Sequence, residues 1–245
     1  DCNLSSGESI VRQILYAKGF FREKLGVDIT TAWALDTFGH NAQMPQILKR
    51  AGFRSMWFSR GVPHCNLPSE FLWQGLDGTQ MAAYWLPFLY SDLHSTPKEL
   101  NGFTKHCTES FSKLEPHTRG SHRVGLAGFD VCPPEPHVPA LIEEFNRQPD
   151  APFVMRLGVP AEYEAAVADQ RGEPVVVKGE LNPIFQGAYS SRIELKQRMR
   201  AMERMLVTAE QFVALARWLG APADEAALWR AWEPVLFNQA HDLAA

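Results

Sequence analysis

The sequence predicts an α/β protein whose C-terminal part changes to a helical bundle, and three observations lead to this prediction. An amphipathic segment is followed by a buried strand, a short helix and a second strand, which is a β-α-β unit. Further on, Asp77-Gly78 is a hairpin-turn signal between two apolar segments. From 191 to 219 apolar residues recur in alternating steps of four and three, which is typical of a bundle seam. We therefore expect an α/β domain over 1–188 and a helical bundle over 189–245.

Each element follows from local periodicity and from turn or cap residues. Ser191 with Glu194 matches a capping box for the long helix, and Gly220 ends that helix. Helices are expected over 9–25, 42–51, part of 95–118, 137–146, 191–219 and 223–237. Strands are expected over 28–35, 55–61, the two arms of 71–87, 122–130, 152–158 and 174–181.

Composition excludes several classes of protein. The 245 residues are 45% hydrophobic and 21% charged, with a net charge of −4 and a pI near 6.1. This balance favours neither nucleic acid nor an anionic membrane as a partner. No apolar run is long enough to cross a bilayer, and no signal peptide is recognisable. The four cysteines, Cys2, Cys65, Cys107 and Cys132, lack CxxC spacing. We expect reduced, mostly buried thiols and a cytoplasmic protein.

Two aspartates follow predicted strands. In TAWALDTFGHNA, residues 31–42, an apolar run ends in Asp36, and the strand predicted over 122–130 ends in Asp130. A buried carboxylate is costly unless a cation or a hydrogen-bond donor pairs with it. Ligands of open parallel α/β folds bind at the carboxyl ends of strands, where two carboxylates suit glycoside hydrolysis or metal-assisted hydrolysis. Aspartate is also common after strands, where it caps the next helix, and from these two positions alone we favour this structural interpretation.

Other candidates are less specific. On spacing alone His40 is a better metal ligand for Asp36 than His241, although neither lies in a ligand motif. Arg60 ends the second strand of the β-α-β unit, where it either grips a ligand or is a solvated charge. Several aromatic rings precede residue 91, and they suit either a sugar site or a core.

Three segments together resemble glycoside hydrolase family 38, the retaining α-mannosidases, and its bacterial-type members most of all. They are ALDTFGHNAQMPQILKRAGFRSMWFSRGVP, ELNPIFQGAYSSRIELKQR and FNQAHDLAA, in the family's order. The opening 1–26 is similar to the family segment before the nucleophile. The resemblance covers essentially the whole chain and implies a parallel-stranded, (β/α)7-barrel-like catalytic domain of the glycoside hydrolase/deacetylase type before the helical bundle.

The resemblance also implies roles for single residues. Asp36 matches the family's nucleophile, which is also a zinc ligand, and Asp130, in Gly-Phe-Asp, matches the general acid/base. His241, in Asn-Gln-x-His-Asp, matches a zinc-binding histidine. His40 would then lie behind the metal ligands and would not bind the metal itself. This reverses the choice of His40 as a metal ligand from spacing alone.

The same resemblance implies the substrate contacts and the metal. Arg60 matches an active-site arginine, Tyr90 a tyrosine that contacts substrate, and Asp242 follows the zinc-binding histidine as a further substrate-binding residue. The cofactor would be one divalent cation, zinc or alternatively cobalt, which would bind two adjacent mannose hydroxyls and help to distort the ring. The substrate would be a terminal α-linked mannose of an oligosaccharide or glycan. A homo-oligomer of the full-length protein is compatible with this picture.

One departure from the family pattern affects the expected activity. The family supplies two more zinc ligands from a His-x-Asp motif on its first strand, and residues 1–30 contain no such motif. The chain begins without Met and stops after AHDLAA, so we expect an internal fragment with weak zinc affinity and little activity alone. Two other hypotheses are a metal-dependent carbohydrate deacetylase and an inactive sugar-binding fragment.

Overall fold

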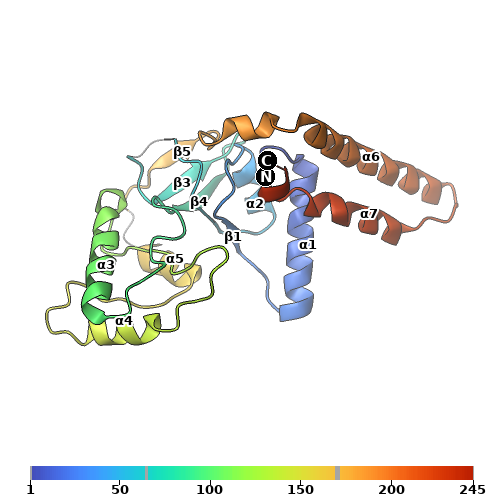
Figure 1. The fold of residues 1–245 in the computed structure, drawn as a ribbon. Coiled ribbons are helices and arrows are strands. Elements are labelled where there is room, and N and C mark those ends of the chain that lie inside the picture. The colour runs from blue at the N-terminus through green and yellow to red at the C-terminus, as the bar shows by residue number, and fades with distance from the viewer. Residues whose placement is uncertain (1, 64–65, 169–171, 245) are drawn as a thin grey trace.

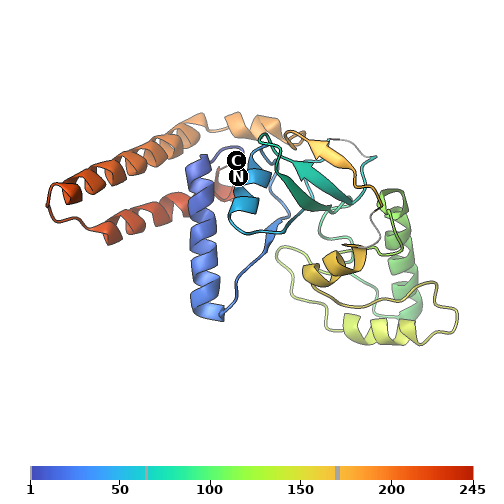
Figure 2. The same cartoon turned by 180° about the vertical axis from the view of Figure 1, so that it is seen from behind.

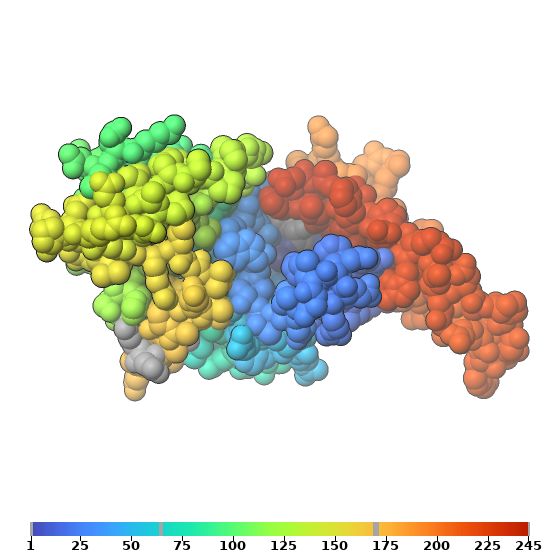
Figure 3. Space-filling view, turned by 90° about the horizontal axis from the view of Figure 1, so that it is seen from below, coloured from blue at the N-terminus to red at the C-terminus, as the bar shows by residue number. Residues whose placement is uncertain are grey.

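The structure is a computed structural model, and it describes residues 2–63, 66–168 and 172–244. A central sheet separates two groups of helices, and the helical arm made by the long α6 and by α7 projects from one side (Figure 1). Seen from below, the region of α4 and the helical arm lie at opposite ends of an elongated molecule (Figure 3). The helices are α1 Gly7–Leu25, α2 Met44–Arg50, α3 Leu100–Lys113, η1 Glu115–His117, α4 Val138–Asn146, α5 Pro160–Ala168, η2 Gln186–Ser190, α6 Ile193–Trp218, α7 Glu225–Phe237 and α8 His241–Ala244.

The sheet is mixed but mainly parallel. Its strands are β1 Thr31–Ala34, β2 Ser55–Phe58, β3 Glu70–Gln74, β4 Gln80–Trp85 and β5 Val176–Lys178. Their order is β1-β2-β4-β3-β5, in which β1, β2 and β4 run parallel, the β3–β4 hairpin is antiparallel, and β5 runs parallel to β3. The predicted α/β class is confirmed. The described strands form one open five-stranded sheet, so a seven-stranded barrel is not confirmed.

Local signals explain why several elements begin and end where they do. The Ser6 hydroxyl accepts a hydrogen bond from the Ser9 amide (3.1 Å) at the start of α1, and Gly26 ends α1 in the left-handed region at φ 68°. The main core packs α1 and α2 against the sheet, around Met56, Phe58 and Trp73. Figure 2 shows α1, in blue, running past the β1 edge of the sheet.

Two predicted strands are wrong. Residues 122–130 have irregular backbone, because Gly125 and Gly128 give a strand no side chains to pack. Residues 152–158 are irregular as well, since the Asn146 side chain takes both backbone groups of Met155, at 2.7 and 2.9 Å, and so occupies hydrogen bonds that a sheet would need. Val154, with 85% of its surface exposed, has no sheet to cover.

The long helix differs from its prediction in two respects. It begins at Ile193, and the Ser191 hydroxyl donates to Ala188 O at 2.9 Å, so the predicted capping box is wrong. The apolar seam is only partly covered, because Met199 is buried whereas Leu195 is 48% exposed. The two long helices form a hairpin, and a complete bundle is not confirmed. The division between residues 188 and 189 stays a prediction.

The cysteines and helices bear on two further expectations. Cys107 is buried, Cys2 is half-buried, and Cys132 is exposed, which corrects the prediction that the thiols are mostly buried; Cys65 lies outside the described residues. Within the parts of the chain that the structure describes, no helix combines the length and apolar character needed to cross a bilayer.

Candidate active site

Strand register brings Asp36 and Arg60 together. Ala34 of β1 lies opposite Phe58 of β2, and the Ser59 amide extends the ladder by donating to Leu35 O at 3.3 Å. The next side chains, Asp36 and Arg60, therefore meet beyond the carboxyl ends of both strands. Nε of Arg60 donates to Oδ1 of Asp36 in an ion pair whose side chains are only 20% and 25% exposed, respectively. Partial removal from water strengthens such a charge-assisted contact.

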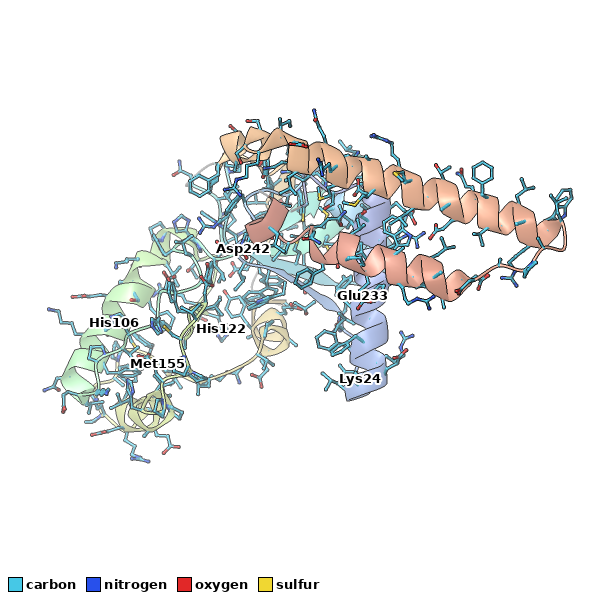
Figure 4. The ribbon with its side chains drawn as sticks, turned by 45° about the vertical axis from the view of Figure 1, so that its right-hand side comes forward. Lys24, His106, His122, Met155, Glu233 and Asp242 are labelled. Atoms are coloured by element: carbon cyan, nitrogen blue, oxygen red, sulfur yellow. The ribbon has the colours of Figure 1, made fainter. Side chains whose placement is uncertain are left out.

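His241 reaches the same carboxylate from the far end of the chain. Its Nε2 lies 3.2 Å from Oδ2 of Asp36, so the two oxygens of Asp36 face an arginine and an imidazole. The same Nε2 lies 3.3 Å from Oδ1 of Asp242, whose side chain is 78% exposed. Figure 4 places Asp242 between the sheet and the helical arm. The ring of Phe38 meets the His241 ring edge-on, with 5.5 Å between centroids, and so limits its tilt.

A buried polar network holds the backbone that leads into His241. Oε1 of Glu203 on α6 accepts from the Ser6 amide (2.8 Å), the Ser9 hydroxyl (2.6 Å) and the Gln239 amide group (2.8 Å). Gln239 also donates to the Ser9 hydroxyl at 3.1 Å. Glu203 is 3% exposed, and its other oxygen accepts from Arg200 at 2.7 Å. The network joins the start of α1, the middle of α6 and the turn before α8. The first residue of α8 is His241.

Tyr90 connects the second aspartate to the first. The Tyr90 hydroxyl donates to Oδ2 of Asp130 at 3.1 Å. Partial burial, the hydrogen bond to Asp130 and the negative charge of Asp36 raise the pKa of Tyr90 to about 12. The phenol therefore stays protonated at neutral pH and is a donor between the two carboxylates. Asp130 itself is exposed.

An aromatic wall flanks Arg60. The guanidinium lies 5.6 Å from the ring centre of Phe38 and 5.9 Å from that of Phe185. These two rings meet edge-on with 5.2 Å between centroids. Phe185 is 59% exposed and has φ 52°, a strained backbone for a residue with a side chain. The cation–π contacts restrict the direction from which Arg60 approaches Asp36.

His40 lies beneath the site and not in it. Its ring is fully buried against Phe58 and Trp73, at 5.0 and 6.3 Å between centroids, and its backbone pairs with Leu181. Burial lowers the pKa of His40 to about 4, so the ring is neutral at physiological pH. The choice of His40 from spacing alone is therefore not supported by its position.

Two side chains of the site are of the chemical type that binds a divalent cation. Asp36 and His241 present a carboxylate oxygen and an imidazole nitrogen to each other, which is the donor chemistry that zinc prefers. Among the residues that the structure describes, no set of three or more His, Cys, Asp or Glu side chains converges on one point. These two residues would therefore supply part of a metal site.

A hollow on the helical arm lies away from this site. It has a volume of about 440 Å³ and is formed along α6 by Arg204, Met205, Phe212 and their neighbours. It holds no carboxylate or imidazole, so we place the candidate active site at the strand ends.

Comparison with known proteins identifies the family. Residues 1–187 match the sequence profile described as "Glycosyl hydrolases family 38 N-terminal domain", and residues 183–245 match "Alpha mannosidase middle domain". The chain belongs to glycosyl hydrolase family 38. The resemblance expected from the three sequence segments is thus confirmed.

Individual α-mannosidases align with nearly the whole chain. "Alpha-mannosidase 2C1" of Homo sapiens is 28% identical over 255 aligned residues, and "Alpha-mannosidase G" of Dictyostelium discoideum is 27% identical over 252. Each alignment covers 99% of this chain but only 23% and 22% of the relative, so the chain spans less than a quarter of their length. A solved α-mannosidase from Enterococcus faecalis V583 superposes with a TM-score of 0.91 at 25% identity, covering 100% of this chain and 29% of that one.

Several residues of this family 38 site are missed by sequence reasoning. Glu203 reads as one charge among many on a long helix, and only its three-way contact with α1 and the α8 turn reveals its role. Gln239 lies within the Asn-Gln-x-His-Asp motif, which is a signal that could have found it. Phe38 and Phe185 are far apart in sequence, so no local pattern joins them.

Proposed function

We propose that this chain carries the catalytic centre of a retaining α-mannosidase that removes terminal α-linked mannose from oligosaccharides. The observation that supports this most is the convergence of two carboxylates. Asp36 is held between Arg60 and His241, and Asp130 is reached through the Tyr90 hydroxyl. A nucleophile and a separate acid are what a retaining glycosidase needs.

In the first step, a carboxylate oxygen of Asp36 attacks the anomeric carbon while Asp130 gives its proton to the departing glycosidic oxygen. The carbon–oxygen bond to the leaving group breaks as the bond to Asp36 forms. In the second step Asp130 takes a proton from water, the hydroxide adds to the anomeric carbon, and Asp36 leaves. Arg60 orients Asp36 through their ion pair, and the Tyr90 hydroxyl donates a hydrogen bond to Asp130.

Asp36 and His241 would hold a zinc or cobalt ion together with donors from outside the pair. Such an ion supplies Lewis-acid binding of two neighbouring hydroxyls, which favours a sugar with an axial 2-hydroxyl. Asp242 is exposed beside His241 and would bind a substrate hydroxyl. The ring wall of Phe38 and Phe185 offers an apolar face for the sugar.

The test uses the chain in its natural full-length context with p-nitrophenyl α-mannoside. We expect release of mannose, first as the α-anomer in NMR spectra, and loss of activity in Asp36→Ala. The exposed Asp150, changed to Ala, is the matched control because it lies outside the site. Activity that survives Asp36→Ala would refute the nucleophile. Release of the β-anomer first would refute retention, and acetate release from acetylated sugars without mannoside cleavage would favour a deacetylase.

A further inference from the structure

Two loops at the strand ends are fastened to each other beside Asp130. One loop follows β4 and contains Tyr90, and the other runs from His122, labelled in Figure 4, to the start of α4 (Figure 1). The Leu93 amide donates to Leu126 O at 3.2 Å. The rings of His94 and Phe129 stack, with 5.4 Å between centroids and an angle of 21° between planes. Asp130 directly follows Phe129, so the ring stack lies next to Asp130 in the chain.

The second fastening is a clasp made by Thr96, Glu135 and His137. The Thr96 amide donates to the Glu135 carboxylate at 3.1 and 3.3 Å, and the Thr96 hydroxyl donates to it at 2.9 Å. Nε2 of His137 lies 2.9 Å from the Thr96 hydroxyl and 3.2 Å from Thr96 O. Thr96 is 6% exposed, so these contacts are largely shielded from water.

Donor accounting fixes the direction of every bond in the clasp. A carboxylate only accepts, so the single hydroxyl proton of Thr96 goes to Glu135. The Thr96 hydroxyl oxygen must then accept from His137, whose Nε2 carries the proton and also faces the Thr96 carbonyl. Burial raises the pKa of Glu135, but the hydrogen bonds from Thr96 outweigh that effect, and the pKa lies below its ordinary value. The carboxylate is therefore charged at neutral pH.

The clasp has a mechanical consequence for Asp130. The loop that carries Asp130 lacks strand pairing, and the aspartate is exposed. Its position depends on Tyr90, on the ring stack and on the clasp that follows five residues later. The Tyr90 loop holds left-handed backbone at Leu89 (φ 73°) and Ser95 (φ 58°), conformations that persist only where surrounding contacts hold them.

We infer that Thr96 and Glu135 are positioning residues that set the acid/base action of Asp130 by clasping its loop to the loop of Tyr90. This inference rests on the proposed function of Asp130. Neither residue touches the reacting atoms. Their effect is to hold the Asp130 carboxyl where it can reach the glycosidic oxygen, because a loosened acid spends less time within hydrogen-bond reach.

The experiment compares leaving groups in the full-length protein. The glycosidic oxygen of α-mannobiose needs a proton to depart, whereas 2,4-dinitrophenolate departs without one. We expect Thr96→Val to lower kcat/KM for mannobiose by about 10-fold or more and to change kcat/KM for 2,4-dinitrophenyl α-mannoside by less than about 3-fold. Thr96→Ser retains the hydroxyl and should restore mannobiose cleavage.

Three further variants accompany this comparison. Thr118→Val removes a hydroxyl that donates to Leu114 O at 2.8 Å, outside both loops, and should leave both substrates unaffected. Glu135→Ala removes the acceptor and should reproduce Thr96→Val, which provides a second variant if the valine protein does not fold. Asp130→Ala tests the acid/base assignment itself and should show the same dependence on the leaving group in a stronger form.

The outcomes are distinct. Equal losses on both substrates in Thr96→Val and Glu135→Ala, or no loss on either, would overturn the clasp while Asp130→Ala keeps its signature. Absence of the signature in Asp130→Ala would overturn the proposed acid/base residue, and with it the inference.

Discussion

Asp36 and Arg60 are joined because their strands are paired in register, with Ala34 opposite Phe58. Each residue lies two positions beyond the pair, so the geometry of β1 and β2 alone determines that the guanidinium meets the carboxylate. Phe38 and Phe185 then limit the movement of the guanidinium. The ion pair is thus a product of the sheet and not of a flexible loop.

We expect Arg60→Met, which keeps the stem and removes the charge, to lower kcat/KM for an α-mannoside by about 100-fold, since a preorganised charge at the nucleophile is lost. Arg60→Lys should lower kcat/KM by less, because the positive charge remains although the planar guanidinium group is lost. The exposed Arg156, changed to Met, is the matched control in the same kinetic assay. An Arg60→Met protein as active as the Arg156 control would contradict a role for the ion pair in catalysis.

Tyr90→Phe removes the hydroxyl that donates to Asp130. The pKa of Tyr90 is raised to about 12, so the wild-type hydroxyl is a donor throughout the neutral range. Without this contact the Asp130 carboxyl is less well positioned, so kcat/KM for α-mannobiose, whose leaving group needs a proton, should fall by about 10-fold. A kcat/KM equal to that of the wild type would show that the Tyr90–Asp130 contact has no influence on the acid.

His40 makes stability depend on pH. Its pKa is about 4 in the fold and near 6.5 when unfolded, so between these values the unfolded chain binds the extra proton. The free energy of unfolding should fall as pH drops from about 6.5 to 4, by up to roughly 3 kcal/mol. Urea unfolding at several pH values measures this slope. His40→Gln should flatten it, whereas His122→Gln, on the exposed surface, should leave it unchanged.

Glu203→Ala removes the acceptor that Ser6 N, Ser9 Oγ and Gln239 Nε2 share, and of these Gln239 also donates to the Ser9 hydroxyl. We expect a loss of about 3 kcal/mol in unfolding free energy. Glu194→Ala on the same helix breaks a pair with Arg198 whose side chains are 76% and 73% exposed, and should cost less than about 0.5 kcal/mol. Similar melting curves for the two variants would disprove a structural role for the network.

Metal content tests the pairing of Asp36 with His241. We expect purified full-length protein to retain zinc or cobalt, detected by elemental analysis after dialysis, and His241→Ala to retain much less. A chelator should abolish mannoside cleavage, and added metal should restore it. His122→Ala is the matched control. Equal metal content in the His241 and His122 variants would exclude His241 as a ligand.

Local signals predict the elements whose causes are local. The Asp77-Gly78 hairpin, the β-α-β unit around α2 and the end of α1 agree with the structure, because turn residues and side-chain periodicity act over a few positions. The prediction over 122–130 is wrong because Gly125 and Gly128 give a strand no side chains to pack. The prediction over 152–158 is wrong because the Asn146 side chain replaces the strand partner.

The sequence by itself determined the α/β class, the family and the strand ends at which Asp36 and Arg60 lie, since each of these follows from short motifs and periodicity. The family resemblance had already favoured His241 over His40 as the partner of Asp36. Only the tertiary structure decided that His241 Nε2 lies against Oδ2 of Asp36, that Glu203 supports the turn before His241, and that Thr96 clasps the loop of Asp130. The physical reason is that these contacts join residues from 36 to 205 positions apart. Their partners are selected by packing, which no local pattern encodes.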